Sequence, residues 1–72
     1  MRIRIFVDGD LTIFEVFWAD YDKEEGVASF FTLDDDVVCV SMSYSAFELC
    51  SRDLLLDGYS DLKMYKANFF EI

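Results

Sequence analysis

The chain has 72 residues, with 15 Asp and Glu against 6 Lys and Arg, which gives a net charge of −9 at pH 7. This charge disfavours direct binding to DNA, RNA or anionic lipid, because their phosphate groups attract Lys and Arg. Hydrophobic residues make up 54% of the chain and aromatic residues 18%, far above the composition of disordered proteins, so we expect a single folded domain over residues 1–72.

The first expected element is a β-hairpin whose strands, residues 2–7 and 11–18, flank Asp8-Gly9. This pair suits the two positive-φ positions of a type I′ turn, and the turn places Arg2 opposite Glu15 as a cross-strand ion pair. The hairpin face that we expect to meet the core carries Met1, Ile3, Ile5, Thr12, Phe14 and Val16. The other face carries Phe6, Leu11, Ile13 and Phe17. That face is unusually apolar for a solvated surface.

A second hairpin follows a turn at residues 20–26. Its strands are residues 27–33 and 37–43, and they flank the run Asp34-Asp35-Asp36. In the later strand, apolar and smaller residues alternate as Val38, Cys39, Val40, Ser41, Met42 and Ser43. This period of two is typical of a strand with one buried face.

The hydrophobic period then changes to that of a helix. The sequence Ser45-Ala46-Phe47-Glu48 matches a capping box with Ser45 as the N-cap, and Gly58 favours a left-handed stop, so we expect a helix over residues 46–56. Its apolar stripe consists of Phe47, Cys50 and Leu54, with further contacts from Leu49, Leu55 and Leu56. The last expected strand covers residues 62–72, with Leu62, Met64, Phe70 and Ile72 in one phase of the alternation.

The element order is therefore ββββαβ, which predicts an α+β fold with an antiparallel sheet of about five strands and one helix packed on one face. In such a sheet the first and third turns lie at the same end, about 10 Å apart, and the helix returns its C-terminus to that end. Seven carboxylates would then meet at one edge: Asp8, Asp10, Asp34, Asp35, Asp36, Asp57 and Asp61. This crowding favours a use in partner binding. The alternative is that Asp forms the turns and keeps an aromatic-rich domain soluble.

A second acidic segment lies between the two hairpins. Its acidic residues are Asp20, Asp22, Glu24 and Glu25, and the aromatic residues beside them are Trp18 and Tyr21. Trp and Tyr are common anchors at protein interfaces, so we expect these six residues to contribute to partner binding. Packing along an edge strand would explain the two aromatic residues equally well.

Metal, cofactor and catalytic chemistry find little support in the sequence. The segment Asp20-x-Asp22-x-Glu24 resembles the start of an EF-hand, but Gly26 is one position late and Phe31 stands where the loop needs a bidentate Glu. The chain has no His, which is the usual general base and a common zinc ligand, and Cys39 and Cys50 do not form a Cys-x-x-Cys pair. We therefore expect no enzyme activity, no metal, no cofactor and two reduced cysteines.

We expect the protein to be localised in the cytoplasm. Asp8 and Asp10 interrupt the N-terminal apolar segment before it reaches the length of a signal peptide. Apolar runs elsewhere fall far short of the roughly 20 residues that cross a bilayer, so we expect no membrane partner. A phage-encoded protein would be localised in the cytoplasm of the host.

These features favour a small acidic inhibitor that binds and blocks a basic, nucleic-acid-binding surface of another protein without binding nucleic acid itself. In size, charge and lack of catalytic groups the chain resembles the small acidic inhibitors that phages make against restriction enzymes, CRISPR effectors, uracil-DNA glycosylase or host RNA polymerase. This resemblance of overall character implies a nucleic-acid-binding enzyme or effector complex as the partner. Two alternatives stay open. One is an immunity or antitoxin-type protein that neutralises a basic toxin, and the other is a homo-oligomeric structural or adaptor domain that dimerises through the apolar sheet face.

Overall fold

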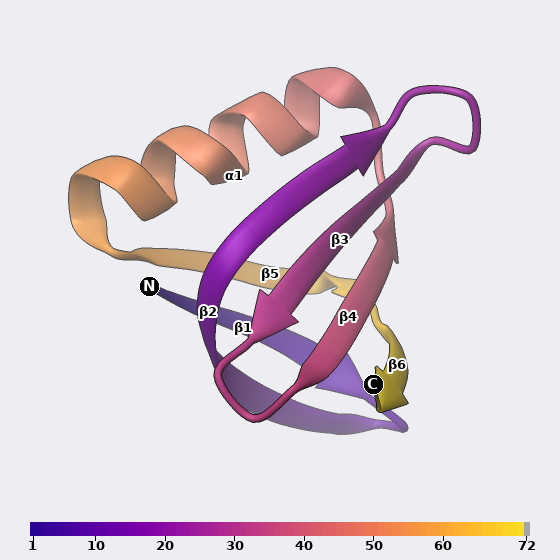
Figure 1. The fold of residues 1–72 in the computed structure, drawn as a ribbon, viewed down its shortest axis with the longest axis vertical. Helices are drawn as coiled ribbons and strands as arrows, with labels where there is room; N and C mark the ends of the chain where they lie inside the picture. Colours follow the sequence, from indigo (N-terminus) through magenta and orange to yellow (C-terminus); the bar gives the residue numbers. More distant parts are fainter. Residues whose placement is uncertain (72) are drawn as a thin grey trace.

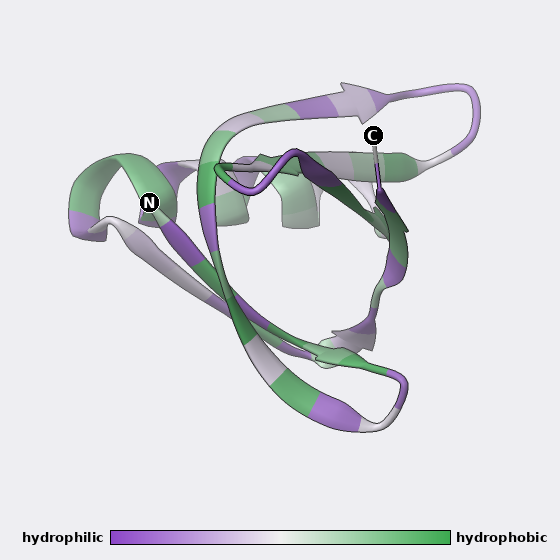
Figure 2. Ribbon diagram, turned by 60° about the horizontal axis from the view of Figure 1, so that its bottom comes forward, coloured by the Kyte–Doolittle hydropathy of each residue, from purple (hydrophilic) through white to green (hydrophobic). Residues whose placement is uncertain are grey.

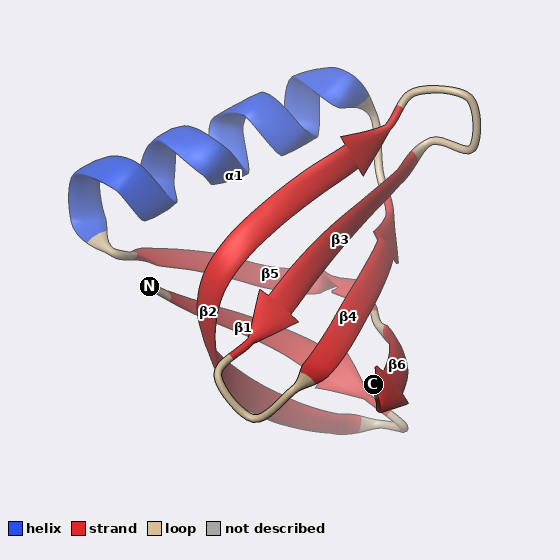
Figure 3. Cartoon of the chain, in the orientation of Figure 1, coloured by secondary structure: helices blue, strands red, loops and turns tan. Residues whose placement is uncertain are grey.

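The computed structural model describes residues 1–71, which form six strands and one helix (Figures 1 and 3). In chain order the elements are β1 (Arg2–Val7), β2 (Asp10–Asp22), β3 (Val27–Thr32), β4 (Asp36–Ser41), α1 (Tyr44–Asp57), β5 (Tyr59–Lys66) and β6 (Asn68–Glu71). The strands form one sheet in the order β5-β1-β2-β3-β4-β6, in which β1 and β5 are parallel and the other neighbours are antiparallel. The predicted α+β class is confirmed, but the sheet is mixed and has one strand more than expected.

The extra strand arises because the last segment of the chain is divided at Ala67. The Ala67 N–H donates a hydrogen bond to the Phe6 carbonyl oxygen at 2.9 Å. β5 and β6 are the two outermost strands of the sheet and are consecutive in the chain, so the sheet curls until its two edges approach each other, and in Figure 2 the strands curve around a common centre. Ile72, expected at the end of this segment, lies outside the described residues.

The alternation expected in the last strand fails at Met64, which is 91% exposed. β5 pairs with β1 from Tyr59 to Asp61, and the register then shifts before Lys66. Leu62 is buried directly after the regular pairing, whereas Met64 lies inside the irregular part. The loss of regular pairing therefore explains why the two residues differ in exposure.

β2 bends to join the two halves of the sheet. Its first part, residues 10–15, pairs with β1, and its second part pairs with β3 after a register shift between Val16 and Trp18. The extra residue, Phe17, forms a β-bulge, which bends a strand and interrupts its alternation. Phe17 and Trp18 are consequently both exposed, at 57% and 59%. Unbroken alternation after buried Val16 would have directed Trp18 into the core.

The first hairpin has the predicted register. Val7 pairs with Asp10, and Asp8-Gly9 has φ angles of 50° and 86°, as a type I′ turn requires. At the other end of β1, Arg2 Nε lies 2.8 Å from Glu15 Oε1, so the expected cross-strand ion pair is confirmed.

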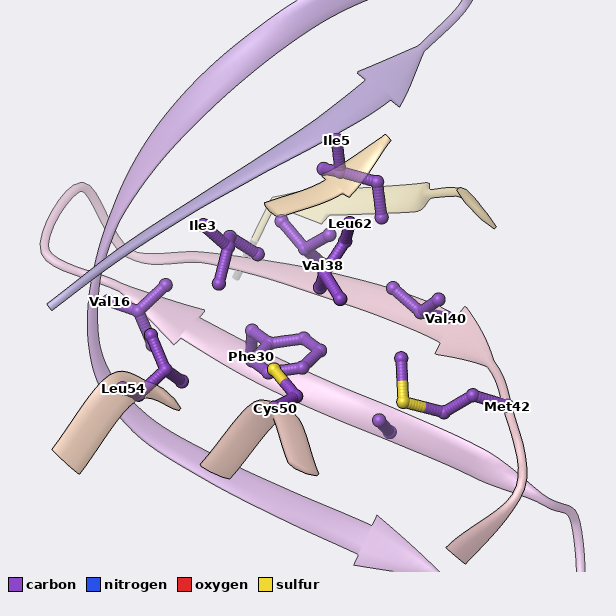
Figure 4. Close-up of a cluster of buried hydrophobic side chains, with 11 residues drawn as sticks. Ile3, Ile5, Val16, Phe30, Val38, Val40, Met42, Cys50, Leu54 and Leu62 are labelled. Carbon is purple, nitrogen blue, oxygen red and sulfur yellow. The ribbon is translucent and has the colours of Figure 1, made fainter. Parts of the chain in front are cut away.

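The core lies between the curled sheet and α1 (Figure 4). Its buried hydrophobic residues are Ile3, Ile5, Val16, Ala28, Phe30, Val38, Val40, Met42, Cys50, Leu54 and Leu62. Phe30 is fully buried, and its ring centroid lies 6.4 Å from that of Phe47, which connects β3 to α1. The predicted buried phase of β4 is confirmed. Met1, expected on the core face, is 41% exposed instead.

α1 begins earlier than expected because Ser43, not Ser45, is its N-cap. Ser43 has an extended backbone, and its Oγ accepts a hydrogen bond from the Ala46 N–H at 3.1 Å. The predicted capping box is therefore wrong. The predicted stop is confirmed, since Gly58 has a φ of 67° and its N–H donates to the Leu54 carbonyl oxygen at 3.0 Å.

The apolar stripe of α1 is narrower than expected. Cys50 and Leu54 are buried and Phe47 is half-buried, as predicted. Three leucines expected to assist them are exposed instead: Leu49 at 53%, Leu55 at 81% and Leu56 at 77%. Within residues 1–71, α1 is the one helix, and it is too short and too polar to cross a membrane.

Ser43→Ala is expected to lower the free energy of unfolding by about 1 kcal/mol, because the substitution removes the side-chain acceptor of the Ala46 N–H. Ser45→Ala is the matched control inside the helix, and we expect it to change that free energy by less than about 0.5 kcal/mol. Urea denaturation of both variants checks the difference. Equal losses in the two variants would contradict Ser43 as the cap.

Candidate partner-binding surface

The acidic turn between β3 and β4 is held by one buried side chain. Thr32 is 2% exposed, and its Oγ1 accepts hydrogen bonds from the backbone N–H groups of Asp34 and Asp36, both at 3.2 Å. Asp35 adopts a φ of 62°, a left-handed conformation that Asp tolerates in turns. The turn therefore has a fixed backbone, from which the exposed residues Asp34 and Asp35 meet solvent.

Glu71 adds a fourth carboxylate to this turn, because it pairs with Asp36 across β4 and β6. Burial raises the pKa of the Asp36 carboxyl, and the charges of Glu71, Asp34 and Asp35 raise it further. We name Asp34, Asp35, Asp36 and Glu71 the β6 acidic cluster. The sequence did not identify Glu71, because its position depends on the pairing of β6 with β4.

Asp36→Asn is expected to stabilise the fold at neutral pH. The raised pKa means that folded Asp36 binds its proton more tightly than the unfolded chain does, so the free energy of unfolding falls as pH rises from the ordinary carboxyl pKa through the raised one. The variant should lose this part of the pH dependence. Urea denaturation from mildly acidic to neutral pH tests it, with Asp10→Asn as the control that removes the same charge from the other acidic turn.

A contradictory result would be an Asp36→Asn variant whose stability follows that of the wild type at every pH. Equal gains for Asp10→Asn and Asp36→Asn would also contradict the local explanation, because they would trace the effect to net charge alone.

The first acidic turn lies near the other end of β6. Asp8 lines a shallow hollow with Asn68, at the start of β6, whereas the Glu71 end of β6 pairs with Asp36. A strand of four residues is about 10 Å long. Asp8 therefore lies about one short strand away from the β6 acidic cluster. The reason differs from the expected one, because the third turn lies beside Glu15, where the Leu33 N–H donates to the Glu15 carbonyl oxygen at 3.1 Å, and β6 rather than a shared sheet end connects it to Asp8.

Asp57 and Asp61 do not join these carboxylates. Because β5 runs parallel to β1, the end of α1 lies beside the start of β1, and the Arg2 N–H donates to the Gly58 carbonyl oxygen at 2.9 Å. Asp57 is thus at the opposite end of β1 from Asp8. Asp61 Oδ2 lies 2.8 Å from Arg4 Nη2, and this hydrogen bond holds the pKa of the Asp61 carboxyl below its usual range. The predicted convergence of seven carboxylates is therefore wrong for these two.

In the turn between β2 and β3, some of the carboxylates accept hydrogen bonds from nearby backbone N–H groups. Asp22 Oδ1 accepts hydrogen bonds from the N–H groups of Glu24 at 2.9 Å and Glu25 at 3.2 Å. Asp20 Oδ1 accepts one from the Tyr21 N–H at 2.8 Å. The alternating carboxylates that resemble the start of an EF-hand thus shape a turn. Glu24 and Glu25 remain exposed beside it.

Of the two aromatic residues predicted as anchors, Trp18 is open to solvent and Tyr21 is part of the fold. The Tyr21 hydroxyl donates to the Met42 carbonyl oxygen at 2.8 Å, and its ring lies 5.2 Å from that of Phe47 and 5.4 Å from that of Tyr44, measured between centroids. Tyr21 therefore fixes the start of α1 against β2. Trp18, 59% exposed, has the accessible ring that an interface anchor needs.

Trp18 begins a row of apolar side chains that crosses the outside of the sheet. It pairs with Phe31 on β3, Phe31 pairs with Val37 on β4, and Val37 pairs with Phe70 on β6. The next residues along β3 and β4, Phe30 and Val38, point into the core, so the row faces outward. Trp18 and Phe70 are exposed, at 59% and 54%, and the two middle residues are half-buried. We name these four residues the aromatic row.

The apolar face of the first hairpin is open within residues 1–71. Its members are Phe6, Leu11, Ile13 and Phe17, and they are 36 to 58% exposed. The last strands therefore leave this face accessible. Phe17 also lines a shallow hollow with Met1 and Leu55, so the face extends toward α1.

Metal-binding and nucleophilic groups are sparse. No three His, Cys, Asp or Glu side chains among residues 1–71 are arranged to hold a metal ion. Both cysteines are free thiols, and burial raises the pKa of Cys50. Cys39 Sγ lies 3.7 Å from Ser29 Oγ. A raised pKa lowers the thiolate fraction, which makes Cys50 a weak nucleophile.

The predicted site residues therefore fall into three places: the two acidic turns at the ends of β6, the turn between β2 and β3 with Trp18, and the separate positions of Asp57 and Asp61. Comparisons with protein-family models, curated proteins and solved structures give no match to this chain.

Proposed function

We propose that this chain is a small, acidic, non-catalytic inhibitor that binds a basic, nucleic-acid-binding surface of another protein. The observation that supports this most is its uncompensated acidity. Two ion pairs form within residues 1–71, Arg2–Glu15 and Arg4–Asp61, and they engage only two of the fifteen acidic side chains. A partner surface rich in Lys and Arg would supply the missing counter-charges.

The arrangement of the acidic turns favours a surface that normally holds nucleic acid. Such surfaces gather Lys and Arg to neutralise a regular series of phosphates. The turns at the two ends of β6 offer negative charges separated by about one short strand, roughly 10 Å. Both turns have a fixed backbone, one through the type I′ geometry and the other through Thr32, so less conformational entropy is lost on binding.

A non-catalytic role agrees with the chemistry of the side chains. The chain has no His to act as a general base near neutral pH. Its buried thiol, Cys50, has a raised pKa. Binding through charge and apolar contacts needs neither a base nor an activated nucleophile.

Capture on the immobilised chain at low salt tests the proposal. We expect a nucleic-acid-binding protein to be retained from a bacterial lysate and to be released by added duplex DNA or RNA as well as by moderate salt. A matched column should carry the Asp34→Asn, Asp35→Asn, Asp36→Asn triple variant and retain much less. Retention that nucleic acid does not disturb would contradict a blocked nucleic-acid site.

One observation favours a second candidate, a homo-oligomeric domain. The exposed apolar face of Phe6, Leu11, Ile13 and Phe17 could be covered by a second copy of the chain. Such a dimer would be held by apolar burial and would change little with salt, whereas binding to a basic partner weakens steeply. Sedimentation at low and high salt distinguishes the two, and a monomer at both would remove the second candidate.

A further inference from the structure

The aromatic row and the charges beside it form one continuous surface on the outside of β2, β3, β4 and β6. The next outward residues along the same strands are Asp20, Ser29, Cys39 and Asn68, which lie opposite one another in that order. Beyond them lie Asp22, Val27 and Ser41. We name these eleven residues, including the aromatic row, the outer sheet face.

The outer sheet face contains two carboxylates, Asp20 and Asp22, and no Lys or Arg. The nearest cation in the sequence is Lys23, whose Nζ lies 4.8 Å from the centroid of the Tyr44 ring at the start of α1. The Lys23 ammonium group therefore makes a cation–π contact with the Tyr44 ring. At the other margin of the face, the turn between β3 and β4 carries exposed Leu33 and the exposed Asp35 of the β6 acidic cluster.

A surface of aromatic rings bordered by carboxylates suits the arginine guanidinium better than the lysine ammonium. The arginine guanidinium is planar, stacks on aromatic rings and forms two parallel hydrogen bonds to a carboxylate. The lysine ammonium is compact and strongly hydrated, so it gains less from a ring. Nucleic-acid bases also stack on aromatic side chains, but their phosphates would meet Asp20 and Asp22 on a chain of charge −9.

We propose that the outer sheet face is a docking surface for arginine side chains of a basic protein, with Trp18 and Phe70 as stacking partners and Asp20 as the ion-pair partner. This inference rests on the proposed function, since it specifies which cation the basic partner presents. The bulge at Phe17 supports the proposal, because it turns Trp18 outward to the row instead of into the core.

Hexa-arginine and hexa-lysine peptides, which carry equal charge, test the proposal directly. Trp18 is the only Trp in the chain, so the fluorescence reports on the surroundings of this one residue of the outer sheet face. We expect hexa-arginine to bind about five- to tenfold more tightly than hexa-lysine and to change the Trp18 emission. Phe70→Ala and Asp20→Asn should each remove most of the preference for arginine. Asn at position 20 keeps an oxygen acceptor for the Tyr21 N–H, so this variant should fold.

Leu56→Ala, on the exposed side of α1, is the control and should bind both peptides as the wild type does. Equal affinity for the two peptides with unchanged Trp18 emission would overturn the docking surface and leave the proposed function intact. Failure of both peptides to bind at low salt would overturn both. A change in Trp18 emission caused by an oligothymidine, with none caused by hexa-arginine, would assign the face to single-stranded nucleic acid and overturn the inference.

Discussion

Changing Asp34, Asp35 and Asp36 together to Asn is expected to slow association with the basic partner by about tenfold or more at low ionic strength. The substitutions change the net charge from −9 to −6 and remove the densest group of carboxylates on the surface. Electrostatic attraction acts mainly on the rate of encounter, so dissociation should change less. Stopped-flow or surface-based kinetics at two salt concentrations measure the difference, which should shrink as salt screens the charges.

The fold should survive this triple substitution. The Thr32 Oγ1 bonds go to backbone N–H groups, which Asn keeps, and Asn tolerates the left-handed conformation at position 35. Repulsion from Glu71 falls, so stability should be unchanged or slightly higher. The matched control changes Glu48 to Gln and Asp53 and Asp57 to Asn on α1. Equal slowing in control and triple variant would assign the effect to net charge, and unchanged association of the triple variant would contradict a role for this turn.

Phe30→Ala is expected to cost about 3–5 kcal/mol of folding free energy. Phe30 is fully buried, and in Figure 4 it lies in the middle of the cluster beside Cys50. The ring also contacts Phe47, so its loss would leave a cavity between β3 and α1. A domain of 72 residues has a total stability of about 4–11 kcal/mol at 0.05–0.15 kcal/mol per residue. The variant should therefore be largely unfolded or melt far below the wild type.

Thermal and urea unfolding followed by circular dichroism measure this loss. Phe17→Ala is the matched control, because it removes the same ring from a position that is 57% exposed, and it should cost less than about 1 kcal/mol. A Phe30→Ala variant that is as stable as Phe17→Ala would contradict the described core.

Local chemistry made the first half of the fold predictable. Asp8-Gly9 determines a two-residue turn, and the turn alone determines the register that pairs Arg2 with Glu15. The parallel pairing of β5 with β1 could not be found in this way, because it joins residues nearly sixty positions apart and leaves no local signal. The wrong placement of Asp57 follows from that missing pair. The predicted N-cap, Ser45, lies two residues after the observed one, Ser43, because a serine at either position suits a helix start.

The candidate surface was only partly predictable for the same reason. The acidic turns are visible in the sequence because Asp marks turns, whereas Glu71 and Phe70 reach them through the β4–β6 pairing. The aromatic row also depends on the bulge at Phe17, which places Trp18 on the face opposite to the one that strict alternation after Val16 would give. A single extra residue in a strand changes which side chains share a face, and alternation alone does not reveal it.

Competition between this chain and labelled duplex nucleic acid for the captured, purified partner is the most direct test of the central claim. We expect increasing amounts of the chain to displace the duplex completely, with no species that contains all three components, and we expect the triple Asn variant to displace it far less well. A stable complex of partner, duplex and chain together would contradict the claim that the chain occupies a nucleic-acid-binding surface.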